Sequence, residues 1–304
     1  MNDHVQIILG SYNGSRFLRE QLDSLLKQTH QNWSLLVTDD GSTDGTLAIV
    51  SDFETANPER EIKVIQGPRR GFAKNFLFGL RAAKPAPFYA FCDQDDIWLP
   101  ERLSMAIETI GGELRPAIAG GRTQYISETG ELLGLSPLFS RAPSFRNALV
   151  QSLFGGNTIT MNRAMRDLLV QDIPDAVIVS HDWWGYLLCT GAGGTVHYLA
   201  EPTVLYRQHN QNLVGGGTGL AARLDRVKRG LQQQFREWTD HNLTGLNSVS
   251  PQLTPTHRKL VLEMTESRRT GPLTSLKFSR REGLYRQTWL GDISLIGLIL
   301  LRRL

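Results

Sequence analysis

Short apolar runs alternate with helical segments through roughly the first hundred residues, and this alternation is what most constrains the fold. The runs Val5–Leu9, Trp33–Val37, Ile62–Ile65 and Phe88–Cys92 have the length of buried strands. Between them, segments such as Arg16–Gln28 repeat apolar residues at helical spacing. Strands and helices in this order predict an α/β fold, with a mostly parallel, Rossmann-like sheet that carries helices on both faces.

A polar turn follows three of these strands. The turns are Ser11-Tyr12-Asn13, Asp39-Asp40 and Asp93-Gln94-Asp95. In a parallel sheet the carboxyl ends of the strands lie at one edge, and open α/β sheets bind their ligands there. We therefore expect the three turns to converge on one site.

The third turn indicates a metal-bound ligand. Asp93 and Asp95 flank one residue, and carboxylates this close repel each other unless a divalent cation lies between them and a phosphate. The alternative is structural, because Asp is common in turns and at helix N-termini. We interpret Asp96 in this second way, with a helix starting at Leu99-Pro100-Glu101.

Bulk composition excludes several classes of protein. A net charge of +3 over 304 residues is too balanced for nucleic acid to be the main partner. Cys92 and Cys189 give neither a metal-binding spacing nor a disulfide framework, which fits a reducing, cytoplasmic setting. We expect no secretory leader, because the first apolar run has only strand length. The apolar tail Ile293–Leu301 is shorter than the ~20 residues that a membrane-spanning helix needs.

A glycine-rich hinge predicts a boundary late in the chain. Gly215-Gly216-Gly217 separates an α/β domain at residues 1–215 from a basic, helical C-terminal region at residues 216–304. That region opens with apolar residues on one face and basic residues around them. Such a segment suits an anionic membrane surface, and it equally suits packing on the first domain or on a second subunit.

The motifs resemble those of family 2 glycosyltransferases with the GT-A fold. They are Ser11-Tyr12-Asn13, Val37–Asp44 and Asp93–Pro100, and the resemblance covers Val5 to Asn212. Finer resemblance, to bacterial rhamnosyltransferases of polysaccharide synthesis, is carried by Phe91–Trp98, His181–Trp184 and Tyr206–His209. Residues 1–215 would then be the nucleotide-sugar-binding catalytic domain.

This resemblance implies transfer of a sugar from a nucleotide diphosphate, with Mg²⁺ or Mn²⁺ offsetting the charge on the leaving group. Asp95 would hold the metal, and Asp93 would contact the metal or the ribose. Asp40 would accept a hydrogen bond from the imide of uracil or thymine, with Tyr12 stacking on the base or lining its pocket. Asp39 is interpreted as shaping its turn. Further donor-binding residues would be Ser11, Asn13, Gln94, Lys74 and Asn75, although Lys74 could instead be solvated.

Asp182 is the candidate catalytic base. An inverting transfer needs one carboxylate to take the proton from the acceptor hydroxyl. The family usually has Glu-Asp at this point, whereas this chain has His181-Asp182, so the role of His181 stays open. The alternative is that Asp182 only stabilises the start of a helix.

Two further groups of residues are assigned by position. Gly155, Gly156, Asn157, Trp183 and Trp184 are expected to border the acceptor, although one tryptophan would equally suit a buried core. His209 is expected as a further metal ligand or as a structural residue, and Arg207 as a phosphate contact.

Three classes of function remain. The leading hypothesis is a metal-dependent, inverting glycosyltransferase, with dTDP-L-rhamnose or another dTDP- or UDP-sugar as donor. Its acceptor would be a free or lipid-linked saccharide. The enzyme would be located in the cytoplasm or at the inner face of the cell membrane. The second class is a metal-dependent phosphohydrolase, and the third is a sugar-binding module that binds donor without turnover. A dinucleotide-dependent oxidoreductase is disfavoured, because no Gly-X-Gly-X-X-Gly follows the first strand.

Overall fold

The computed structural model describes residues 3–171, 178–209 and 220–304, with residues 220–233 described as backbone only. Its contacts divide the chain into two units. The first comprises Met1–Leu138, Phe154–Gln171 and Gly194–Gln208, and the second comprises Phe139–Leu153, Asp172–Gly193 and His209–Leu304. The boundary predicted at Gly215–Gly217 lies outside the described residues.

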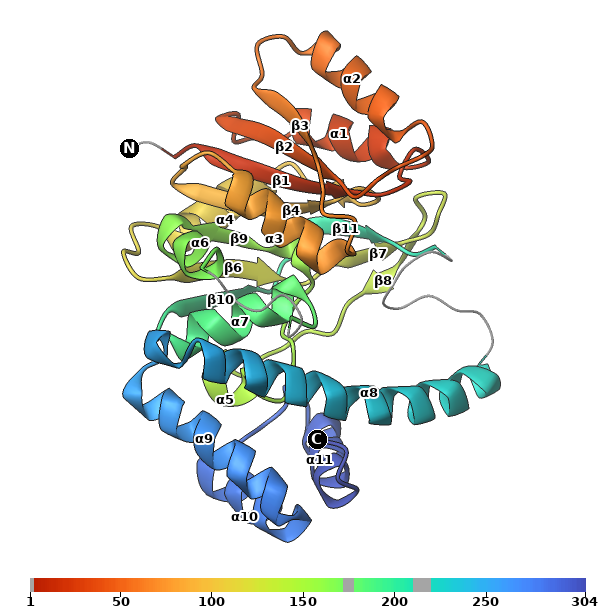
Figure 1. The fold of residues 1–304 in the computed structure, drawn as a ribbon. Helices are drawn as coiled ribbons and strands as arrows, with labels where there is room; N and C mark the ends of the chain where they lie inside the picture. Colours follow the sequence, from red (N-terminus) through yellow and green to blue (C-terminus); the bar gives the residue numbers. More distant parts are fainter. Residues whose placement is uncertain (1–2, 172–177, 210–219) are drawn as a thin grey trace. The chain divides into compact units, whose positions relative to one another are not determined.

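A seven-stranded sheet is the centre of the first unit (Figure 1). Its order is β10-β6-β9-β4-β1-β2-β3, and only β9 runs antiparallel to its neighbours. The strands are β1 (Val5–Ser11), β2 (Trp33–Asp39), β3 (Ile62–Gln66), β4 (Phe88–Asp93), β6 (Ala117–Gly121), β9 (Thr160–Asn162) and β10 (Thr195–Leu199). The predicted, mostly parallel sheet is confirmed.

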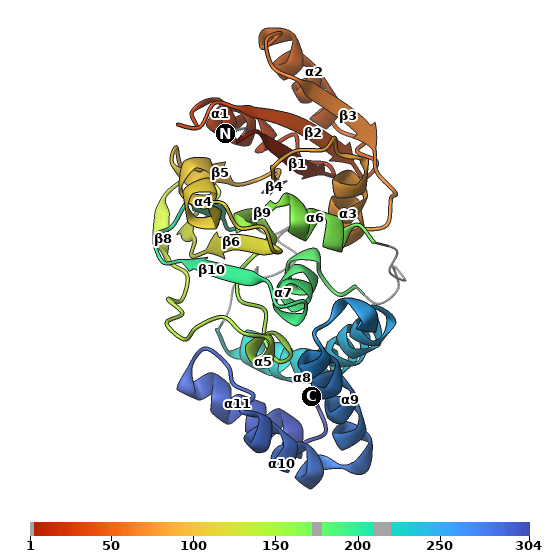
Figure 2. The same ribbon diagram turned by 90° about the vertical axis from the view of Figure 1, so that its left-hand side faces the viewer.

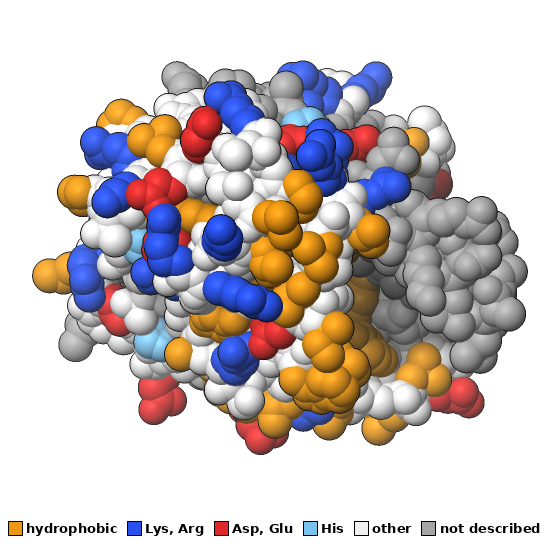
Figure 3. Space-filling model, turned by 90° about the horizontal axis from the view of Figure 1, so that it is seen from below, with side chains coloured by type: hydrophobic (Ala, Val, Ile, Leu, Met, Phe, Trp, Pro, Cys, Tyr) orange, Lys and Arg blue, Asp and Glu red, His pale blue; other side chains and the backbone are white. Residues whose placement is uncertain are grey.

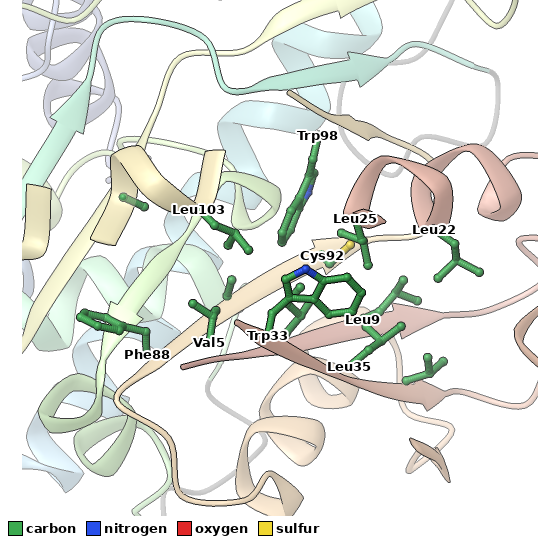
Figure 4. Close-up of a cluster of buried hydrophobic side chains, with 14 of the residues drawn as sticks. Val5, Leu9, Leu22, Leu25, Trp33, Leu35, Phe88, Cys92, Trp98 and Leu103 are labelled. Atoms are coloured by element: carbon green, nitrogen blue, oxygen red, sulfur yellow. The ribbon is translucent and has the colours of Figure 1, made fainter. Parts of the chain in front are cut away.

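Helices cover both faces of this sheet (Figure 2). They are α1 (Leu18–Leu26), α2 (Thr46–Ala56), α3 (Phe72–Ala82), α4 (Arg102–Ile110) and α6 (Arg163–Leu169). Buried residues of α1, α2 and α4 join one core cluster with Val5, Leu9 and Leu35 of the strands (Figure 4). Strand residues alternate between faces, and Phe91 accordingly meets Phe76 of α3 on the other side, with ring centroids 5.2 Å apart.

A four-stranded sheet completes the first unit, in the order β5-β11-β7-β8. Its strands are β5 (Ile97–Trp98), β7 (Gln124–Ile126), β8 (Leu132–Leu135) and β11 (Val204–Arg207). Because β5 pairs with β11, the acidic turn after β4 is held between two sheets. The turn therefore has fixed supports at both ends.

The second unit is helical. It contains α5 (Phe145–Ala148), α7 (His181–Gly191), α8 (Leu220–Ser248), α9 (Pro255–Thr270), α10 (Pro272–Glu282) and α11 (Trp289–Leu300). α7 lies in its core, since a Cβ on Gly191 would lie 2.8 Å from Leu253 and 3.1 Å from Phe145. The predicted helical extension is confirmed. None of the helices in the described ranges is both long and apolar enough to cross a lipid bilayer.

Candidate active site at the carboxyl edge of the sheet

The three polar turns lie at one edge of the large sheet, as the sequence predicts. The parallel register pairs Ser11 of β1 with Asp39 of β2, and Gly10 of β1 with Asp93 of β4. The carboxyl ends of β4, β1 and β2, which are neighbours in the sheet, therefore lie side by side.

Side-chain hydrogen bonds fix the turns to one another. The amide of Gln94 contacts Tyr12 twice, accepting from its N–H at 2.9 Å and donating to its carbonyl at 3.0 Å. Asn13, in the left-handed region at φ 47°, accepts from the N–H of Thr43 at 2.9 Å. These two amide side chains therefore hold the turns together. The ring of Tyr12 is 59% exposed and faces outward.

Asp39 shapes the second turn. Its carboxylate accepts hydrogen bonds from the hydroxyls of Ser11 (2.8 Å) and Ser42 (2.5 Å). It also accepts from the main-chain N–H groups of Gly41 (3.1 Å) and Ser42 (2.8 Å). The Ser11 hydroxyl thereby donates to Asp39, and its predicted contact with the donor stays a prediction.

Asp40 organises the neighbouring loop between β3 and α3. Its two carboxylate oxygens accept from the N–H groups of Arg69 (2.6 Å) and Gly71 (2.9 Å). Both of these residues have positive φ, at 57° and 88°. Each carboxylate oxygen keeps a second acceptor position, so contact with a base imide stays a prediction.

The two residues predicted on α3 differ in their surroundings. Asn75 is 2% exposed, and its amide both accepts from the hydroxyl of Thr38 and donates to the Thr38 carbonyl, each at 2.7 Å. Asn75 therefore holds α3 on β2, and its predicted contact with ribose or phosphate stays a prediction. Lys74 is half-buried in the first turn of the helix, and its role stays a prediction.

Three carboxylates gather after β4. Asp93, Asp95 and Asp96 offer oxygen atoms that all lie within 4.8 Å of one another. The first two are half-buried and the third is buried. A hard divalent cation such as Mg²⁺ or Mn²⁺ prefers oxygen ligands of this kind, and its charge would relieve their mutual repulsion. The residues present therefore fit the metal that the resemblance implies.

Asp96 does not lie at a helix start, contrary to the prediction. It precedes β5, and α4 begins only beyond that strand. Its side chain is 0% exposed, and its oxygens accept from the side-chain N–H of Asn157 at 2.6 Å and the main-chain N–H of Arg207 at 3.1 Å. Burial raises its pKa well above the usual range, and the charges of Asp95 and Asp93 raise it further.

A buried arginine lies among the residues that support this turn. Arg102 stacks on the ring of Trp98, with its guanidinium carbon 3.7 Å from the ring centroid. It donates to the hydroxyl of Thr160 and to the carbonyls of Phe91, Asn157 and Ile159. Burial lowers its pKa to about 10, so it remains positive at neutral pH. Sequence reasoning missed Arg102, since arginine is usually exposed.

Arg207 is also buried, and its guanidinium is used within the fold. It donates to the carbonyl of Asp95 at 3.1 Å and to the carbonyl of Glu128 at 2.8 Å, and it forms an ion pair with Glu20 at 2.5 Å. These bonds correct the predicted phosphate contact. Arg207 instead secures the main chain of the acidic turn.

The segment predicted to border the acceptor lies next to Asp96. Asn157, in a single turn of 3₁₀ helix (Gly156–Thr158), is buried and committed through its side chain to Asp96. Its predicted contact with the acceptor stays a prediction. A Cβ on Gly155 would lie 2.6 Å from the side-chain oxygen of Asn157. Gly155 is exposed and Gly156 is buried, and a role for either in acceptor binding stays a prediction.

We expect Asn157→Leu to destabilise the first unit. The change keeps a similar volume but leaves buried Asp96 without its side-chain donor, which costs about 1–3 kcal/mol. Urea unfolding measures this loss. In a double-mutant cycle, the same substitution should cost less when Asp96 is already replaced by Ala, which has no side-chain oxygen to accept from Asn157. Equal costs in both backgrounds would show that the contact is not the cause.

Asp182 and the two tryptophans lie on α7 of the second unit. Asp182 is half-buried in the first helical turn and accepts from the N–H of Trp183 at 2.8 Å. Trp183 donates its ring N–H to Ala148 at 2.7 Å, and Trp184 is 0% exposed. Both tryptophans are buried, as the sequence left open for one of them, and their contact with the acceptor stays a prediction. The role of Asp182 as base also stays a prediction.

His181 makes the stability of the second unit depend on pH. Burial lowers its pKa to about 4, against the opposing charge of Asp182, whereas an unfolded histidine has a pKa near ~6.5. The unfolded state therefore binds more protons between these values, and stability falls as the pH drops from about 6.5 toward about 4. The free energy of unfolding, measured with urea at pH 7 and at pH 5, should differ less between the two pH values in His181→Gln than in the parent. Exposed His241 on α8 is the matched control, and His241→Gln should retain the full difference.

His209 is the first residue of the last segment of the second unit. Within the described ranges, the cluster of carboxylates that could hold a metal ion consists of Asp93, Asp95 and Asp96, and His209 is not part of it. Its predicted part in metal binding stays a prediction.

Comparison with known proteins agrees with this geometry. A model of "Glycosyl transferase family 2" matches residues 6–173. The dTDP-rhamnosyl transferase RfbG of Shigella flexneri is 25% identical over 72% of this chain and 78% of its own length. Staphylococcus aureus TarS in complex with UDP-GlcNAc superposes with a TM-score of 0.56 at 16% identity, covering 93% of both chains. The mannosyltransferase PcManGT of Pyrobaculum calidifontis, in complex with GDP-Man and Mn²⁺, gives a TM-score of 0.53 at 16% identity, over 98% of this chain and 85% of that one.

The family match covers more than half of the chain, and the arrangement of strands and polar turns is the one expected for it. The chain is a glycosyltransferase that belongs to glycosyl transferase family 2 and has the GT-A fold.

Proposed function

We propose that the chain is an inverting, metal-dependent glycosyltransferase that transfers L-rhamnose from dTDP-L-rhamnose to a saccharide in bacterial polysaccharide synthesis. The observation that carries the proposal is the carboxylate group of Asp93, Asp95 and Asp96, at the same sheet edge as Asp40 and Tyr12. Together these residues offer a cation site and a pyrimidine site at one edge, as a nucleoside diphosphate requires.

The choice of sugar rests on likeness. RfbG is named a dTDP-rhamnosyl transferase, and rhamnose is therefore our first candidate. TarS binds UDP-GlcNAc, so a UDP-sugar is the alternative donor within the same chemistry. The acceptor would be a growing saccharide, free or on a lipid carrier.

The residues of the first unit would bind and orient the donor. Asp93 and Asp95 would hold Mg²⁺ or Mn²⁺, which when bound offsets negative charge on the departing diphosphate. Buried Asp96, fixed by Asn157 and Arg207, keeps the turn in place. Asp40 would accept from the base imide, and the exposed ring of Tyr12 would stack on the base.

The second unit would supply the base. Asp182 would take the proton of the acceptor hydroxyl as that oxygen bonds to the anomeric carbon, on the face opposite the leaving group. The bond from the anomeric carbon to the diphosphate oxygen breaks with its electron pair, so the nucleoside diphosphate leaves and the configuration inverts.

A donor panel tests the proposal. The chain is incubated with dTDP-, UDP- and GDP-sugars, with Mn²⁺ or with EDTA, and the released nucleoside diphosphate is measured. We expect slow, Mn²⁺-dependent release from dTDP-L-rhamnose. Release from a UDP-sugar alone would mean that dTDP-L-rhamnose is not the donor, but the chain would still be a glycosyltransferase. Binding of a donor without release, in the presence of saccharide acceptors, would favour a sugar-binding module. Phosphate release from simple esters would support a phosphohydrolase, although the carboxylate group within the described ranges contains no histidine.

A further inference from the structure

The last helix of the second unit exposes a continuous apolar stripe. Its members recur at intervals of four, three and four residues, which places them on one helical face: Trp289, Ile293, Ile296 and Leu300. Trp289 is 70% exposed. The opposite face is buried and consists of Leu295, Leu298 and Ile299. The exposed stripe runs for about 16 Å, and Leu290 and Leu301 widen it on one side.

Positive charge borders the stripe. Arg141 forms an ion pair with Asp292 at 2.7 Å, and Arg286 donates to Ser294 at 2.9 Å, so both guanidinium groups lie against α11. Arg302 is exposed just beyond the helix. Figure 3 shows apolar side chains gathered beside Lys and Arg on the face seen from below.

The same part of the sequence carries an excess of basic residues. Residues 255–304 hold ten Lys and Arg against four Asp and Glu, whereas residues 1–254 hold 23 against 26. The chain's net positive charge therefore comes from the segment that contains the stripe. An anionic surface would be attracted to this segment, whose net charge is positive, more than to residues 1–254 taken together, whose net charge is negative.

We propose that α11 docks in the interfacial layer of an anionic lipid membrane, with its axis along the surface and the stripe among the lipid chains. A helix of 12 residues is too short to span a bilayer, which takes ~20. α11 itself carries one charged residue, Asp292, and its inner face is buried in the second unit. Its outer face presents Trp and aliphatic side chains with basic residues nearby, a combination found in segments that lie on membranes. Arg302 would contact lipid phosphates while the stripe leaves water. Arg141 is paired with Asp292, and Arg286 is bonded to Val150 and Ser294, so both are held within the second unit.

A second copy of the chain fits this face less well. A two-fold interface places the same patch of both copies in contact. The basic borders of the two stripes would then come close together, and like charges that meet across an interface are unfavourable. An anionic lipid surface has the complementary charge. The inference does not rest on the proposed donor chemistry, because membrane binding needs no nucleotide sugar.

Vesicle flotation of the full chain tests the proposal. We expect the chain to float with phosphatidylcholine vesicles that contain phosphatidylglycerol, to float less with phosphatidylcholine alone, and to lose binding as salt is added. Ile293→Ser/Ile296→Ser should lower the partition coefficient by about tenfold or more, since two apolar side chains no longer enter the lipid. The matched control Val64→Ser/Leu114→Ser, which replaces two exposed apolar residues of the first unit, should float like the parent.

Circular dichroism measures the melting temperature, which the double variant should keep because both Ile residues are exposed. Light scattering measures whether the chain is a monomer or a dimer. A second double variant, Trp289→Ser/Leu300→Ser, repeats the flotation test at two other positions of the stripe. No flotation of the parent, or equal flotation of parent and stripe variants, would overturn the proposal. It would also be overturned by a dimer that the stripe variants dissociate while the parent stays off the vesicles, because the stripe would then join two copies.

Discussion

Asp95→Asn should lower kcat/KM for sugar transfer by about 10³-fold, which corresponds to ~4 kcal/mol of lost transition-state stabilisation. Asp95 is one of three carboxylates whose oxygens lie within 4.8 Å of one another, and it would hold the cation that offsets charge on the leaving diphosphate. The amide keeps the shape of the side chain but removes its charge. Transfer is measured with saturating acceptor over a range of donor and Mn²⁺ concentrations.

The matched control for this change is Asp52→Asn, an exposed aspartate on α2. It removes the same charge from the first unit without touching the acidic turn, and transfer should be unchanged. Added Mn²⁺ should rescue Asp95→Asn only in part, because one ligand is missing. Parental activity in Asp95→Asn would remove the acidic turn from the mechanism.

Asp182→Asn should lower the rate of transfer by about 10³-fold while donor affinity stays within a factor of about two. The asparagine oxygen can still accept from the N–H of Trp183, as Asp182 does at 2.8 Å, so the start of α7 is preserved. What is lost is a carboxylate that can take the proton of the acceptor hydroxyl. Initial rates with acceptor, and calorimetric titration with donor, separate the two effects.

The alternative for Asp182 predicts a different pattern. If its charge only stabilises the N-terminus of α7, the substitution costs about 0.3–1 kcal/mol of stability and leaves the rate of transfer intact. A fall in the rate of transfer at unchanged donor affinity would support the base. A lower melting temperature without a fall in the rate would support the alternative.

The sequence allows the frame of the site to be predicted because that frame depends on local patterns. Apolar runs of strand length ended in polar turns, and parallel pairing then required Ser11, Asp39 and Asp93 to meet at one edge. The two-residue strand β5 is too short to show alternation, so the sequence does not predict it. Without β5, the sequence pattern puts a helix start near Asp96, whereas in the structure Asp96 precedes a strand.

The supports of the site could not be predicted because they depend on contacts distant in the sequence. Asp96 is held by Asn157 and Arg207, which lie 61 and 111 residues away. Arg102 and Arg207 are buried although arginine is usually exposed, and no neighbouring residue signals this. Trp183 and Trp184 show the converse problem, since an aromatic pair in sequence does not distinguish a core from a wall that binds sugar.

Calorimetric titration of the chain with dTDP, in Mn²⁺ and in EDTA, tests most directly whether the acidic turn and the pyrimidine residues form one site. We expect dTDP to bind in Mn²⁺ at least about tenfold more tightly than in EDTA, and we expect Asp95→Asn to abolish this difference, since the cation would link Asp95 to the diphosphate. Equal affinity with and without Mn²⁺, or no binding of dTDP or UDP under either condition, would contradict a metal-bound pyrimidine diphosphate at this edge of the sheet.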